Sequence, residues 1–183
     1  MNPVHPSAPL WLALAALGLA ATPARAGEPL GTDLYAGYSY AKLDDLSRHG
    51  ASLAVGFHAL GPLAGFVDAG AHWGSQEGTS RSDLTLMAGP GARFGSRGGT
   101  VFFVRALAGL VRDSSSIGVL DVDISESHAA FGVLAGGGVD LRVAKSLALR
   151  AQGDYQWTDS DTLAKKSGYR LGAGVVYRFG TAP

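Results

Sequence analysis

The chain has 183 residues, with 15 basic and 15 acidic side chains, 27 glycines and no cysteine. This length fits one domain, the balanced charge argues against a nucleic-acid-binding protein, and the lack of cysteine excludes a disulfide scaffold, a thiolate metal site and a cysteine nucleophile. No apolar run reaches the roughly 18 residues of a membrane-spanning helix, so another structure must account for a composition that is 46% hydrophobic.

The first element along the chain is an export signal. Leu10 to Ala21 form an apolar run that is too short to span a bilayer. The sequence Ala24-Arg25-Ala26 then supplies the small-x-small pattern of a signal-peptidase site, which places the cut before Gly27. We expect residues 1–26 to be a cleaved signal peptide and residues 27–183 to form the mature protein. A buried helix or an N-terminal anchor is the alternative.

From Asp33 onward, apolar and polar residues alternate with a period of two, which is the period of a β-strand. Turn residues separate the alternating segments from one another. The pattern predicts eight strands, at Thr32–Lys42, Gly50–Leu60, Ala64–Gly74, Asp83–Gly95, Thr100–Arg112, His128–Val143, Ser146–Trp157 and Gly168–Gly180.

The predicted connections alternate in length. Tight turns are expected at 61–63, 96–99 and 144–145, and longer polar loops at 43–49, 75–82, 113–127 and 158–167. An even number of strands, with short turns at one end and long loops at the other, is the plan of an outer-membrane barrel.

The longest of these loops has two features. Its acidic residues suggest loose Ca²⁺ binding, but they lack the glycine and the ligand spacing of a dedicated site, so we favour a solvated acidic loop. Its apolar residues indicate that the fifth and sixth strands extend beyond the membrane as a hairpin, whose exposed edge could add a partner's strand. The apolar residues are Ile117, Val119, Leu120, Val122 and Ile124, and the acidic ones are Asp113, Asp121, Asp123 and Glu126.

Each predicted strand carries an apolar face, and the opposite face holds small, polar and charged residues. Eight strands enclose a narrow lumen, so we expect the apolar face to meet lipid and the charges to pair inside. The predicted interior network comprises Asp68, His72, Asp83, Arg93, Arg105, Asp140, Arg142, Arg150, Asp154, Arg170 and Arg178. A soluble lipocalin-type barrel, with an apolar interior, and a soluble β-sandwich are the alternatives.

Aromatic residues gather near both ends of the predicted strands, as in the interfacial girdles of a membrane protein. The girdle on the side of the long loops comprises Tyr38, Tyr40, Trp73, Tyr155, Trp157 and Tyr169, and the opposite one Phe57, Phe94, Phe102, Tyr177 and Phe179. On the sixth strand, alternation places Ala135 on the lipid face and its neighbour Leu134 in the interior, where we expect polar groups and some water.

The strand count, the loop pattern and the final strand, Gly174-Val175-Val176-Tyr177-Arg178-Phe179, resemble the small outer-membrane barrels: the OmpA transmembrane domain, the OmpX/Ail adhesins and the opacity-type proteins. The resemblance implies an all-β, eight-stranded antiparallel up-and-down transmembrane barrel in the bacterial outer membrane. It also implies that Gly174, Tyr177 and Phe179 form a C-terminal assembly signal read by the barrel-insertion machinery. We expect the barrel to be the entire mature protein.

Candidate chemistry is sparse. The interior charges fit either a polar gate or a network of ion pairs and hydrogen bonds in which the buried charges pair with one another, and we favour the network. Some barrels of this family modify lipid A, and Ser125, Glu126, Ser127 and His128 have the residue types needed for acyl transfer. Alternation, however, points His128 inward, away from a lipid substrate, and His58 and His72 fit the interior network better. We assign no catalytic residue, metal site or cofactor.

The sequence therefore predicts a structural or surface-interaction barrel with an adhesin-like role. A small-solute or ion pore is the first alternative, and a lipid A-modifying enzyme is the second. The expected surroundings are outer-membrane lipid and lipopolysaccharide, with an extracellular ligand on the four long loops. We expect a monomer that does not bind nucleic acid.

Overall fold

The computed structural model describes residues 31–43, 46–58, 62–76, 79–95, 99–119, 122–159 and 166–179. The predicted signal peptide lies outside these residues. Within them, no helix is long and apolar enough to cross a membrane.

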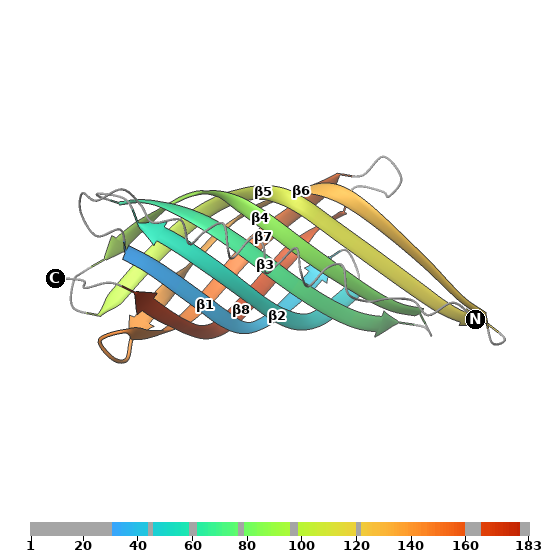
Figure 1. Cartoon of the computed structure of the whole chain (residues 1–183), viewed down its shortest axis with the longest axis horizontal. Helices are drawn as coiled ribbons and strands as arrows, with labels where there is room; N and C mark the ends of the chain where they lie inside the picture. Colours follow the sequence, from blue (N-terminus) through green and yellow to red (C-terminus); the bar gives the residue numbers. More distant parts are fainter. Residues whose placement is uncertain are drawn as a thin grey trace.

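The described chain forms a closed antiparallel barrel in which each strand pairs with its neighbours in sequence (Figure 1). The first strand closes the barrel on the last, from Thr32↔Phe179 to Leu43↔Gly168. This confirms the predicted fold and all eight predicted strands. The strands are β1 (Gly31–Leu43), β2 (Leu46–His58), β3 (Leu63–Gln76), β4 (Thr79–Gly95), β5 (Thr100–Val119), β6 (Val122–Arg142), β7 (Leu147–Asp159) and β8 (Lys166–Phe179).

The predicted long loops at 43–49, 75–82 and 113–127 are wrong. In each case the strands continue through the expected loop, and the last pairs are Leu43↔Leu46, Gln76↔Thr79 and Val119↔Val122. Hydrogen bonds between paired strands satisfy the backbone N–H and C=O groups whatever the side chains are. Polar residues can therefore continue a strand beyond the membrane as readily as they form a loop. The fourth predicted loop, 158–167, retains residues 160–165 between β7 and β8, outside the described chain.

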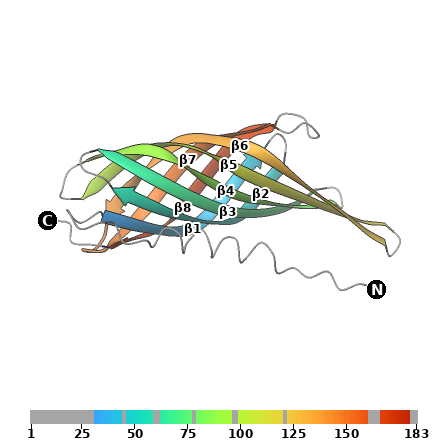
Figure 2. The same ribbon diagram turned by 45° about the horizontal axis from the view of Figure 1, so that its top comes forward.

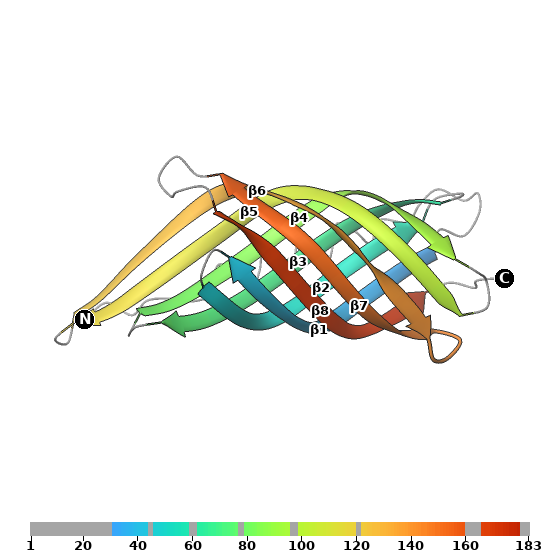
Figure 3. The same cartoon turned by 180° about the vertical axis from the view of Figure 1, so that it is seen from behind.

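The predicted extension of the fifth and sixth strands is confirmed. β5 and β6 pair along their whole length and project beyond the other strands as a long hairpin (Figures 1 and 2). We call this end of the barrel the hairpin end. The opposite end, where β1 begins and β8 finishes, is the terminal end, and Figure 3 shows both from behind.

The apolar face of the barrel is the outer one, as predicted. Leu110 is 63% exposed and Phe102, Phe131 and Leu171 are also exposed, whereas charged side chains such as Asp68, Arg105 and Arg170 are buried inside. This is the reverse of a lipocalin-type barrel, whose apolar side chains fill the interior.

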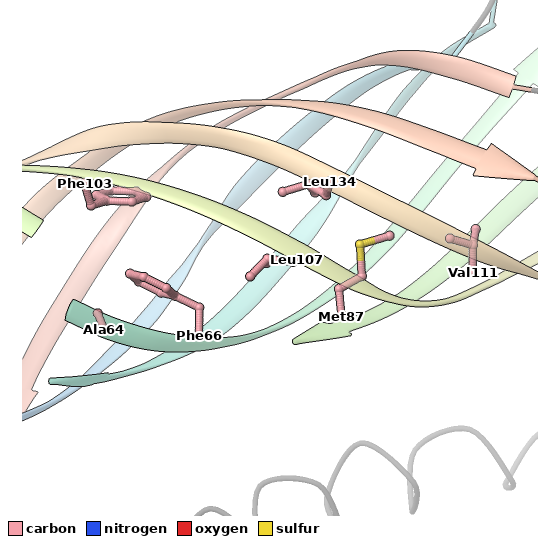
Figure 4. Close-up of a cluster of buried hydrophobic side chains, with 7 residues drawn as sticks. All are labelled: Ala64, Phe66, Met87, Phe103, Leu107, Val111 and Leu134. Carbon is pink, nitrogen blue, oxygen red and sulfur yellow. The ribbon is translucent and has the colours of Figure 1, made fainter. Parts of the chain in front are cut away.

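The lumen also holds buried apolar side chains beside its charged ones. Seven of them form one cluster, which we call the apolar plug: Ala64, Phe66, Met87, Phe103, Leu107, Val111 and Leu134 (Figure 4). The expectation that Leu134 lies among polar groups is therefore wrong, although its inward direction is right. Small residues elsewhere on the inner faces leave room for large side chains, and close packing fills that room. A second inner cluster comprises Tyr35, Ala54, Ala148 and Val176.

Candidate functional site

The middle of the lumen holds a closed set of ion pairs, the central cluster, formed by Asp68, Arg105, Asp154 and Arg170. Arg105 contacts Asp68 at 3.0 Å and Asp154 at 2.7 Å, and Arg170 contacts the same two carboxylates at 2.8 and 3.2 Å. Two arginines therefore face two aspartates, and all four side chains are fully buried. Balanced pairing of this kind is what allows charges to remain ionised away from water.

A second group, the hairpin-end cluster, lies nearer the projecting hairpin and comprises Ser39, Arg48, His72, Asp83 and Asp113. Arg48 contacts Asp83 at 2.6 Å and Asp113 at 3.3 Å. The two ring nitrogens of His72 hydrogen-bond to Asp83 at 3.1 Å and to Ser39 at 2.8 Å. β1 to β5 are thereby joined across the lumen.

A third group, the terminal-end cluster, comprises Asp33, His58, Arg93, Asp140, Arg150 and Arg178. Arg150 donates from Nε and Nη2 to the two oxygens of Asp140, at 2.7 and 3.0 Å. Arg93 contacts Asp33 at 2.7 Å and also donates to His58. The guanidinium of Arg150 lies over the ring of Phe103, 4.3 Å from its centroid, so this cluster also contacts the apolar plug.

The structure thus places ten of the eleven predicted network residues in three interior clusters. The eleventh, Arg142, is half-buried on the inner face at the terminal end. Sequence reasoning missed Asp33, Ser39, Arg48 and Asp113 as members. Arg48 was assigned to a loop, yet it lies two residues before Gly50 and four before Ser52, so continuing the alternation would have placed it inside.

The predicted aromatic girdle near the hairpin end lies on the outer surface. Trp73 is 57% exposed, and Tyr38, Tyr155, Trp157 and Tyr169 are also exposed, with Tyr40 less so. The rings of Tyr155 and Trp157 lie 4.5 Å apart, and those of Tyr40 and Tyr169 lie 6.3 Å apart. At the terminal end, Tyr177 and Phe179 make a similar pair at 4.7 Å.

His128 lies on the inner face of β6, as alternation predicted, and is registered opposite Asp113. The side chains of Ser125, Glu126 and Ser127 lie outside the described part. Within the described residues, no three His, Cys, Asp or Glu side chains form a group that could hold a metal ion.

A family model described as the outer membrane protein β-barrel domain matches residues 12–179. Among solved structures, the chain is similar to Neisserial surface protein A, with a TM-score of 0.59 and 20% identity, over 82% of this chain and 97% of that one. It is also similar to Ail of Yersinia pestis (TM-score 0.61, 16% identity, 83% and 100% coverage) and to OprG of Pseudomonas aeruginosa (0.56, 9%, 84% and 98%). No curated protein matches the chain. At these identities the structural matches establish the fold.

Proposed function

Because the chain belongs to the outer membrane protein β-barrel family, it is a bacterial outer-membrane barrel protein, and we propose that it acts as a closed barrel displaying a surface for interaction outside the cell. In this proposal the hairpin end faces the outside and the terminal end faces the periplasm. The barrel supplies a rigid body, and the β5–β6 hairpin supplies the binding element.

The surface-interaction role is supported mainly by the unequal pairing of the two edges of β6. β5 pairs with β6 up to Val119↔Val122, whereas pairing of β6 with β7 begins only at Phe131↔Asp159. Among the described residues, β6 is therefore paired on one side only from Val122 to Ala130. A free strand edge presents N–H and C=O groups in the spacing that another strand needs, which is the basis of β-strand addition.

A hairpin deletion tests this role. Residues 115–126 are replaced by two glycines, which removes the projecting tip and keeps the ladder below it. Bacteria of a non-adherent strain expressing each form are then tested on immobilised matrix proteins and on heparin, because one of the Ail structures holds a heparin analogue. We expect attachment with the full hairpin and its loss with the deletion. Equal attachment by both forms, or by neither, would reject the proposal.

The three ion-pair clusters and the apolar plug support a closed lumen. Side chains as large as Arg48, Arg170, Phe103 and Met87 are fully buried inside it. An ion following this path would have to break paired charges or cross an apolar layer, both of which are costly. We therefore expect planar bilayers containing the purified protein to show no discrete conductance steps, with a general porin as the positive control. Stable channel openings would instead support a pore.

Export and assembly complete the proposal. Residues 1–26 serve as the cleaved signal, and Gly174, Tyr177 and Phe179 at the end of β8 serve as the signal for the insertion machinery. The proposal includes no catalysis, because His128 lies on the inner face whereas lipid acyl chains lie outside. Mass spectra of lipid A from cells with and without the protein should be identical.

A further inference from the structure

The charges of the terminal-end cluster do not balance. Arg93, Arg150 and Arg178 all contact a single carboxylate oxygen, Oδ2 of Asp140, at 3.3, 3.0 and 3.3 Å. The second acid of the cluster is Asp33, which pairs mainly with Arg93, at 2.7 Å. Three guanidinium groups therefore share two carboxylates, which leaves one positive charge in excess among these five side chains.

The excess of positive charge is clearest at Arg178. Its Nε is buried and donates no hydrogen bond to any described residue. Oδ1 of Asp33 is 3.8 Å from this Nε, which is too far for a hydrogen bond. A buried donor without an acceptor is destabilising, so an added acceptor at this place would be bound favourably.

The cluster is also accessible. The side chains of Arg93, Arg178 and His58 are 15%, 14% and 19% exposed, whereas those of Arg105 and Asp154 in the central cluster are 0% exposed. β2, β4 and β6 end, and β3, β5 and β7 begin, at this mouth of the barrel. A small solute can therefore reach the outer guanidinium groups without opening the lumen.

We propose that the terminal-end mouth of the barrel is a binding site for an oxyanion, a carboxylate or a phosphate, held by Arg93 and Arg178. Guanidinium groups bind both anions through paired hydrogen bonds, and such charge-assisted bonds are roughly twice as strong as neutral ones. In the orientation proposed above, the ligand is a group presented in the periplasm, and the site itself depends on neither the orientation nor the hairpin.

Arginine modification tests the site in the intact protein without any substitution. The folded barrel in an uncharged detergent is treated with phenylglyoxal in the presence of increasing inorganic phosphate or acetate, at ionic strength held constant with chloride. Modified peptides are then quantified by mass spectrometry. We expect saturable protection of Arg93 and Arg178, with no protection of Arg81 near the hairpin end. Protection by phosphate alone identifies a phosphate-bearing ligand, and protection by acetate alone a carboxylate.

A pair of variants gives the second measurement. Arg178→Gln should raise the anion concentration that half-protects Arg93 at least about tenfold, because a charged donor is lost. Arg81→Gln, the matched control, should leave it unchanged, and both variants are first shown to fold by their mobility on unheated gels. Lack of saturable protection with either anion in the parent protein, or equal protection of Arg81, would overturn the proposal.

Discussion

Arg105 and Asp154 form a bidentate, fork-like ion pair in the middle of the lumen. Nε and Nη2 of Arg105 donate to Oδ1 and Oδ2 of Asp154 at 3.1 and 2.7 Å, and both side chains are fully buried. This geometry gives the strongest type of arginine–carboxylate pair. Asp154 also accepts from Arg170 at 3.2 Å, so one carboxylate ties β5, β7 and β8 together.

Replacing Asp154 by asparagine should therefore destabilise the barrel strongly. The change keeps the shape of the side chain but leaves two buried arginines sharing Asp68 alone, and an uncompensated buried charge costs about 3–5 kcal/mol. Urea unfolding of the barrel in lipid vesicles measures the loss. Asp159→Asn, an exposed position at the end of the same strand, is the control and should change the unfolding free energy by less than about 0.5 kcal/mol. Similar losses for both variants would contradict the assignment of the fork.

Strand positions and faces could be predicted from the sequence because alternation is a local signal. Phe103 and Leu107 depart from simple alternation, because they are apolar residues on the same face of β5 as Arg105. Their burial in the apolar plug explains the irregularity: the lumen needs apolar volume between its charged layers. Which inner residues form charged layers and which form the plug depends on the register of all eight strands, and alternation within one strand does not contain that information.

The ends of the strands could not be predicted for a different reason. Arg48 and Asp113 are polar residues between apolar segments, and in sequence they look like loop residues. In the barrel they pair at 3.3 Å from β2 and β5, strands that are not neighbours in the sheet. Only closure of the barrel brings them together, so this pair could not be found before the fold was known.

The apolar plug predicts the cost of placing a polar group at Leu134. This side chain is fully buried among Met87, Leu107 and Val111. Leu134→Gln buries an amide beside apolar neighbours, which should cost about 1–3 kcal/mol in the same unfolding assay. Leu134→Met keeps the volume and the apolar character and should cost less than about 1.5 kcal/mol. If glutamine were tolerated as well as methionine, the plug would have to contain water or a polar partner.

The outer face predicts a large penalty for charge at Ala106. This residue is exposed on β5, midway between the exposed Phe102 and Leu110. Ala106→Arg should cost about 2–4 kcal/mol, because the guanidinium is placed near the hydrocarbon midplane. Ala106→Leu places an apolar side chain at the same position and should fold into vesicles as stably as the parent. Equal stability of the arginine variant would mean that this face does not meet lipid.

Closure of the barrel predicts its behaviour on gels. Every strand pairs on both sides, and β1 is hydrogen-bonded to β8, so the membrane-spanning region has no open strand edge. Its backbone groups are satisfied internally, and detergent alone should therefore not unfold the barrel. The unheated protein in detergent should migrate faster than the boiled protein. A soluble sandwich would migrate identically with and without heating and would be released from cells with the osmotic-shock fraction.

The seam between β1 and β8 depends on two facing glycines. Gly37 and Gly174 are registered opposite each other, and the ring of Tyr35 lies against both. A Cβ on Gly174 would lie 2.5 Å from Cα of Gly37 and 2.8 Å from Cε2 of Tyr35, which is closer than real contacts allow. The glycine therefore allows the two strands and the buried tyrosine ring to approach closely, a role separate from its place in the proposed assembly signal.

Gly174→Ala should accordingly loosen the seam and destabilise the folded barrel by about 1–3 kcal/mol, the usual cost of overpacking a filled interior. Gly65→Ala is the matched control, because a Cβ there would meet no atom within 4 Å. Alanine at that position lowers the entropy of the unfolded chain, so the control should be neutral or slightly stabilising. Unfolding of purified, refolded protein separates this effect from assembly in cells, where Gly174→Ala could also impair recognition by the insertion machinery. If the purified Gly174 variant were as stable as the Gly65 variant, the close approach of Gly37, Gly174 and Tyr35 would not hold the seam together.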